Sequence, residues 1–168
     1  MLRAITAIFV TASMLLGAAL PGAAETVELR VGKGRASVDV PDSWRTSRIK
    51  RGAQFATRDD EVIVWVEVYT EDTLDTILAE HKSYYADHNV IFTGKPKTQH
   101  AKSNEVAWTL LDYTATFKGK PTIVQYILMD PNLPGGGKLM FSTWASPEGD
   151  RKYEKESNSI VNSVSFTR

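Results

Sequence analysis

The sequence predicts an α+β fold: a mostly antiparallel sheet of about six strands with helices on both faces, an α/β/α sandwich. Most of the chain after residue 25 consists of short segments with period-two hydrophobicity, which is typical of strands. Two segments, one over residues 73–88 and one starting at residue 147, change to a helical period of 3.6. Several strands are apolar on both faces, so we expect cover on both sides of the sheet.

The first 24 residues have the three parts of a secretory signal peptide. Arg3 precedes an apolar run over residues 4–20, Pro21 breaks the run, and small residues lead to a predicted cleavage before Glu25. A transmembrane anchor is the alternative, but the run is short for one and contains Gly17. We therefore expect residues 25–168 to form a single domain that does not span a membrane.

Charge and cysteine content exclude several classes of function. The 20 Lys and Arg residues balance 20 Asp and Glu residues, so the basic surplus of a nucleic-acid-binding protein is missing. The chain has no Cys, which excludes disulfides, Cys-ligated zinc, thiol catalysis and a lipid-modified cysteine. An exported chain of this kind suggests a bacterial envelope protein, periplasmic or secreted, whose oligomeric state the sequence leaves open.

The first half of the domain is predicted as strands and a helix. Residues 26–31 and 37–40 form a hairpin, and weaker strands over 44–49 and 53–57 surround a turn at Arg51-Gly52. The strongest strand covers residues 62–70. One face of it carries Val62, Val64, Val66 and Val68, and the other carries Ile63, Trp65, Glu67 and Tyr69. The helix over 73–88, with Asp72 as its expected N-cap, buries Leu74, Ile77, Leu78, His81 and Tyr85.

The second half begins with short strands at 90–93 and 96–99. A long hairpin follows over 106–117 and 122–129, and its predicted register pairs Tyr113 with Tyr126 and Phe117 with Thr122. A loop over residues 130–137 leads to a strand over 138–145. The last helix begins with Ser146 as N-cap and Pro147 at its first position. Its buried stripe is predicted as Tyr153, Ser157, Ile160, Val161 and Val164, and residues 164–167 form a brief last strand.

The sequence contains none of the common catalytic motifs. No G-x-S-x-G elbow occurs, and Gly135-Gly136-Gly137-Lys138 lacks the first glycine and the final Ser or Thr of a phosphate loop. His81 and His88 lie two helical turns apart, about 10 Å, which is too far for one metal ion. We therefore expect no enzyme activity, no metal and no cofactor.

Six residues remain as candidates for partner or ligand binding: Arg45, Arg48, Arg51, Trp65, Trp108 and Asp112. The arginines, with Lys50, form a cationic segment that suits an anionic partner, or else protects an edge strand from aggregation. The tryptophans suit either a binding surface or the core. Asp112 and Glu67 are carboxylates within apolar strands, so they are either an acid/base pair with raised pKa values or ordinary ion-pair partners.

Two segments resemble the PsbP-like superfamily. Residues 36–44 (ASVDVPDSW) are similar to its opening strand, proline and tryptophan. Residues 139–148 (LMFSTWASPE), a helix with Tyr153, and residues 160–166 (IVNSVSF) are similar to its last strand and helix. The superfamily includes the photosystem II extrinsic P subunit, Ran-binding Mog proteins and bacterial DcrB-like envelope proteins. The resemblance implies an α/β/α sandwich, no enzyme activity, and roles in protein binding or assembly, and it transfers no functional residue.

Three hypotheses about function follow. The leading one is a non-catalytic exported envelope protein that binds another, unidentified envelope protein. The second is a small-ligand-binding protein with an aromatic pocket between the sheet and the first helix. The third is a hydrolase that uses Asp112 or Glu67.

Overall fold

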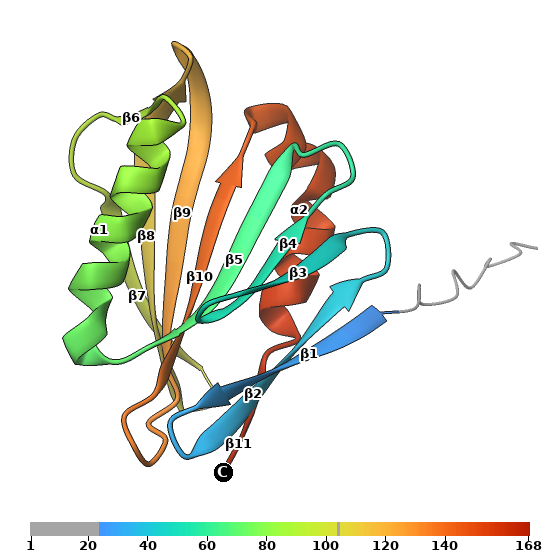
Figure 1. Ribbon diagram of the computed structural model, residues 1–168, viewed down its shortest axis with the longest axis vertical. Coiled ribbons are helices and arrows are strands. Elements are labelled where there is room, and N and C mark those ends of the chain that lie inside the picture. The colour runs from blue at the N-terminus through green and yellow to red at the C-terminus, as the bar shows by residue number, and fades with distance from the viewer. Residues whose placement is uncertain (1–23, 104) are drawn as a thin grey trace, which may run out of the picture.

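The computed structural model describes residues 24–103 and 105–168 (Figure 1). The predicted signal peptide, apart from Ala24, lies outside the described residues. The elements are β1 (Ala24–Val31), β2 (Gly34–Pro41), β3 (Arg45–Ile49), β4 (Gly52–Ala56), β5 (Val62–Tyr69), α1 (Glu71–Asp87), β6 (Val90–Phe92), β7 (Lys97–Ser103), β8 (Val106–Phe117), β9 (Lys120–Asp130), β10 (Lys138–Ala145), α2 (Pro147–Asn162) and β11 (Ser165–Thr167). The predicted α+β class is confirmed.

The strands form two antiparallel sheets. The larger sheet has eight strands. Six of them follow the order β3-β4-β5-β10-β9-β8, and the other two, β6 and β7, both pair with β8, at opposite halves of that strand. The smaller sheet has the order β1-β2-β11. The prediction of one sheet with about six strands is therefore wrong. Hydrophobic period identifies a strand, but it does not say which sheet the strand joins, so the sequence could not separate the first hairpin from the rest.

Two hydrophobic clusters lie on opposite faces of the larger sheet. One face packs against α1, through Ile77 and Tyr85 of the helix and Tyr126 and Met140 of the sheet. The other face is covered by α2 and by the three-stranded sheet together. The sequence predicted helices alone as the cover of each face, so this part of the prediction is corrected. Figure 1 shows α1 along one side of the large sheet and the small sheet crossing its lower end.

Strand β5 lies between β4 and β10, as its two apolar faces predict. Val62, Val64 and Val66 are buried in the cluster that includes α2. Trp65 and Tyr69 belong to the cluster beneath α1, so the predicted alternation of faces is confirmed.

Both helices occur where the sequence places them. The N-cap of α1 is Thr70 and not Asp72, and its backbone N–H donates to Thr73 Oγ1 over 2.9 Å. Asp72 instead lies in the first turn, where its charge is favourable. The predicted start of α2 is confirmed, because Ser146 Oγ accepts a 2.9 Å hydrogen bond from the Gly149 N–H.

The β8–β9 hairpin has a tighter turn than predicted. Phe117 pairs with Lys120 and Tyr113 pairs with Val124, two residues away from the expected register. Lys118 and Gly119 both have positive φ values, 50° and 77°, which allow a two-residue turn in place of the four-residue loop we predicted. A shift of two residues keeps each side chain on its face, so the predicted faces of the hairpin are still correct.

Candidate functional site

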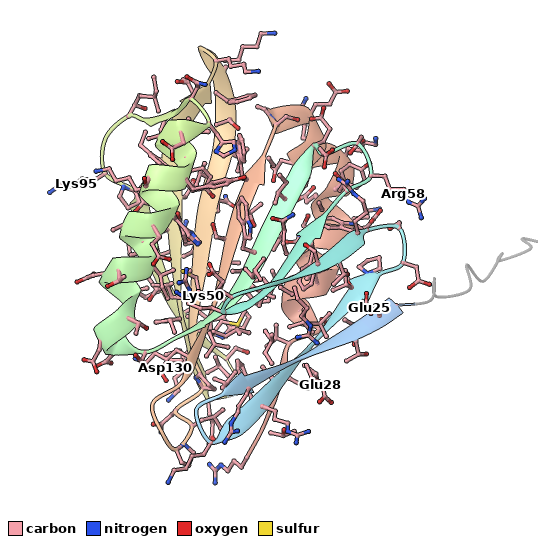
Figure 2. The ribbon with its side chains drawn as sticks, viewed as in Figure 1. Glu25, Glu28, Lys50, Arg58, Lys95 and Asp130 are labelled. Atoms are coloured by element: carbon pink, nitrogen blue, oxygen red, sulfur yellow. The ribbon has the colours of Figure 1, made fainter. Side chains whose placement is uncertain are left out.

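A pocket of about 260 Å³ lies between α1, β5 and the β3–β4 turn. Its lining consists of Ile49, Lys50, Arg51, Trp65, Glu67, Glu80, His81, Tyr84 and Tyr85. Lys50, labelled in Figure 2, lies at the end of β3 nearest to α1. Two of the six candidate residues from the sequence, Arg51 and Trp65, are thus brought together.

A close approach of two strands positions the β3–β4 turn beside the pocket. A Cβ atom on Gly52 would lie 1.9 Å from the backbone oxygen of Val66, so only glycine fits at this point. The turn is also held by the Val68 N–H, which donates to the Arg51 carbonyl over 3.0 Å. These contacts direct Arg51 toward the face of β5 that α1 covers.

The floor of the pocket is a buried network of charged side chains. Glu67 is 4% exposed; its Oε1 accepts from Arg51 Nε over 3.0 Å, and its Oε2 lies 2.6 Å from His81 Nε2. Arg51 also contacts Glu80 Oε2 through Nη2, at 2.7 Å. The network therefore connects the β3–β4 turn, β5 and α1 through four side chains.

The network keeps Glu67 ionised. Burial raises the pKa of Glu67, but the hydrogen bond to His81 and the charges of His81 and Arg51 outweigh it, so the pKa lies below its usual range. Burial lowers the pKa of Arg51, and its contacts with Glu80 and Glu67 more than compensate. The ion-pair alternative for Glu67 is confirmed, and both oxygens of its carboxylate are engaged.

Aromatic rings form the wall of the pocket. Trp65 meets Tyr84 and Tyr85 edge-to-face, with ring centroids 5.5 Å and 6.1 Å apart. Trp65 Nε1 donates to Gln54 Oε1 over 2.9 Å, and the Tyr85 hydroxyl lies 3.1 Å from Ser142 Oγ. These hydrogen bonds fix the rings, while Tyr84 remains 39% exposed.

The aromatic wall continues along the sheet beyond the pocket. The ring of Trp144 lies 6.5 Å from Tyr84, and the ring of Phe117 lies 5.3 Å from Trp144. We call Trp65, Tyr84, Trp144 and Phe117 the aromatic band. All four are partly exposed, although three of them also pack against the cluster beneath α1. Tryptophan and tyrosine, which make up three of the four, are among the residue types most enriched in the energetically dominant positions of protein interfaces.

The other two candidate arginines make contacts of their own outside the pocket. Arg45 pairs with Asp60 and donates to the Thr57 carbonyl over 3.1 Å. Arg48 donates to the Glu28 carbonyl over 3.3 Å. The cationic segment is therefore divided between an ion pair, a contact with β1, and the pocket.

Trp108 and Asp112 lie on the opposite face of the large sheet. Trp108 packs in the cluster that includes α2. Asp112 is on the same face of β8 and lies 3.5 Å from Gln125 Nε2. Because Glu67 faces α1, the two carboxylates that the sequence offered as an acid/base pair are on opposite sides of the sheet.

Sequence reasoning did not select Glu80, His81, Tyr84 and Tyr85 as site residues. A signal for His81 was present: it is the one imidazole in an apolar helical stripe, as Glu67 is the one charged residue of β5. Taken separately, His81 is explained as a residue at the edge of the core, and Glu67 as a partner in an ion pair. Their pairing depends on how α1 crosses the sheet, which no local pattern encodes.

Within 24–103 and 105–168, no group of three or more His, Asp or Glu side chains could hold a metal ion. Over the same ranges, neither helix is long and apolar enough to cross a membrane.

The fold is similar to that of two solved structures. Cyanobacterial PsbP (CyanoP) from Synechocystis sp. PCC 6803 superposes with a TM-score of 0.57 at 7% identity, over 79% of this chain and 86% of that one. LpqN of Mycobacterium tuberculosis, described as involved in cell envelope biogenesis, gives 0.58 at 14% identity, over 86% and 92%. No family model matches the sequence, and no curated protein matches it significantly. The PsbP-like fold inferred from sequence is confirmed.

Proposed function

We propose that the chain is a non-catalytic, exported envelope protein that binds another protein by taking one of its apolar side chains into the pocket beside α1. The observation that carries the proposal is the pair of rings at the pocket mouth, Trp65 and Tyr84. They are held edge-to-face, and Tyr84 remains exposed. A rigid aromatic rim around a pocket loses little conformational entropy when a partner binds.

The size of the pocket suits a single anchoring side chain. A cavity of about 150 Å³ holds benzene, so the 260 Å³ of this pocket can take a phenylalanine or tryptophan side chain. Interfaces of this kind concentrate their binding energy in a few anchors that fill pockets.

An envelope location is supported by the signal peptide that the sequence predicts and by the kind of protein that shares the fold. LpqN is described as involved in cell envelope biogenesis, which is compatible with a periplasmic or secreted place for this chain. The absence of catalysis is supported by the site itself. Glu67 has both oxygens engaged and Asp112 lies on the other face of the sheet, so these two carboxylates do not form an acid/base pair.

Site-specific cross-linking tests this proposal. A photoreactive amino acid would replace Tyr84 in one strain and Lys102, an exposed residue of β7, in a control strain. We expect a discrete cross-linked envelope protein from position 84 and none from position 102. The adduct should disappear when Trp65→Ala is added. The same adduct from both positions, or none from position 84, would contradict the proposal.

A small free ligand is the second candidate, favoured by the position of the pocket between the sheet and α1. Trp65, Tyr84 and Tyr85 could enclose an aromatic molecule of one or two rings. Thermal-shift and native-mass measurements with indole and benzoate as probes would test this function. A rise in melting temperature that is lost in Trp65→Ala would support it, and no shift with a broad aromatic set would count against it.

A further inference from the structure

A second and larger hollow, of about 850 Å³, lies at the end of the large sheet where the β8–β9 turn, the β4–β5 connection and the start of α2 meet. We call it the end groove. Its apolar lining comes from Ile63, Phe117, Pro121 and Trp144. It shares no lining residue with the pocket beside α1.

Two facing rims of the end groove carry charges of opposite sign. The β8–β9 turn contributes Lys118 and Lys120, which are exposed and form no ion pair within the part of the chain that the structure describes. The opposite rim contributes Asp60, which also pairs with Arg45, and Glu61, which accepts from the Ser146 hydroxyl. At the start of α2, Glu148 and Arg151 add one charge of each sign.

This distribution is poorly suited to a simple ion. Three cationic and three anionic side chains line the groove, so its formal charge is balanced. An anion near the lysines would also face the acidic rim, and a cation near Asp60 would face the lysines. A partner must instead present acid opposite the basic rim and base opposite the acidic rim, with an apolar centre between them.

A second copy of this chain has that pattern. A two-fold axis through the groove places the basic rim of one copy against the acidic rim of the other and brings the two apolar linings together. We infer that the end groove is the contact surface of a symmetric homodimer. The contact would bury Phe117 and Trp144 of the aromatic band, but it uses none of the residues that line the pocket beside α1, so the inference does not depend on that pocket.

The local shape agrees with such a contact. The β8–β9 turn projects beyond the ends of the neighbouring strands (Figure 1). No atom lies within 4 Å of where a Cβ on Gly119 would be, so the tip of the turn is free. Lys118 Nζ lies 4.9 Å from the centre of the Phe117 ring, which holds the lysine beside the groove. A projecting turn next to a hollow is the combination that a two-fold contact can fit together.

Sedimentation velocity of residues 25–168 over a wide range of concentrations tests the inference. We expect a concentration-dependent dimer whose dissociation constant rises about tenfold or more in Lys118→Glu/Lys120→Glu. The matched control is Lys95→Glu/Lys102→Glu, which changes the net charge equally outside the groove; Figure 2 shows Lys95 on the loop beside α1. Thermal melts would establish that each variant is folded.

A charge exchange makes the test specific. Asp60→Lys/Glu148→Lys should also weaken the dimer, and mixing it with Lys118→Glu/Lys120→Glu should restore a dimer that contains one copy of each. Lysine is compatible with the positive φ of 58° at position 60, since Lys118 itself adopts 50°. A wild-type chain that stays monomeric, or a dimer unaffected by the turn variant, would overturn the inference. An equal rise of the dissociation constant in Lys95→Glu/Lys102→Glu would also overturn it.

Discussion

His81 of α1 and Glu67 of β5 lie 2.6 Å apart between Nε2 and Oε2, and both are largely buried. Glu67 is the one charged residue of β5, and His81 is the one imidazole in the apolar stripe of α1. Arg51 completes the site from the β3–β4 turn. The three side chains join the β3–β4 turn, β5 and α1, and they form the floor of the pocket that we propose as the binding site.

Replacing Glu67 should destabilise the protein. We expect Glu67→Gln to lower the free energy of unfolding at neutral pH by about 3 kcal/mol, at the low end of the range for breaking a buried ion pair, because Arg51 keeps Glu80. Urea denaturation followed by tryptophan fluorescence would measure it. Glu80→Gln, at the exposed end of the network, is the control and should cost less than about 1 kcal/mol.

The same pair predicts a pH dependence of stability. The folded-state pKa of Glu67 lies below the ordinary value of about 4.3, so the stabilisation from its ionisation is complete above that pH. It is lost as the pH falls through the folded-state pKa. We therefore expect the difference in unfolding free energy between wild type and Glu67→Gln to shrink as the pH falls below about 4.3. A difference that stays constant with pH would contradict this assignment.

Trp65 should be important for stability as well as for the pocket. It is half-buried against α1 and donates to Gln54, so we expect Trp65→Ala to cost about 3 kcal/mol, at the lower end of the range for aromatic truncation. Trp65→Phe keeps a ring and should cost less. Equal unfolding free energies for the alanine variant and wild type would show that the ring is not part of the core.

Gly52 should not tolerate a side chain. Because a Cβ there would lie 1.9 Å from the Val66 oxygen, Gly52→Ala must separate β4 from β5 and should cost about 3 kcal/mol. It should also displace Arg51 from Glu67. Gly119→Asn is the control: the space around it is open and asparagine tolerates positive φ, so its effect should stay within about 0.5 kcal/mol. Comparable losses in the two variants would contradict the role given to Gly52.

The exported protein should begin at Glu25. The three-part signal predicts cleavage after Ala24, which is the first residue of β1, so cleavage would remove almost nothing from the sheet. Intact-mass measurement of the exported protein would test this prediction. A mass that includes Met1 in the exported fraction would show that the segment is retained.

The sequence predicted those features of the fold that depend on a local pattern of residues. The alternation in β5, the stripe of α1 and the Ser146-Pro147 start of α2 follow from period and capping, and all are confirmed. The number of sheets and the β8–β9 register were wrong. They depend on long-range pairing and on a turn whose residues adopt positive φ, and neither is visible in a hydrophobic pattern.

The site could be predicted only in part. Arg51 and Trp65 were selected for their chemistry, and the structure places both in one pocket. Trp108 and Asp112 were candidates too, but they face the other side of the sheet, because alternate residues of a strand point to opposite faces. The sequence could not predict which candidate side chains meet in one pocket, because this depends on the path of α1 across the sheet.

The most direct test of the proposed function is to compare folding and partner binding in Tyr84→Ala. Tyr84 is 39% exposed, so we expect its removal to lower the unfolding free energy by only about 1 kcal/mol. For the binding measurement, the photoreactive amino acid replaces Lys50, which lines the same pocket. We expect Tyr84→Ala to abolish cross-linking of the partner from this position. Lys82→Ala, another exposed change on α1, should preserve capture. Undiminished capture by a folded Tyr84→Ala protein would contradict the account.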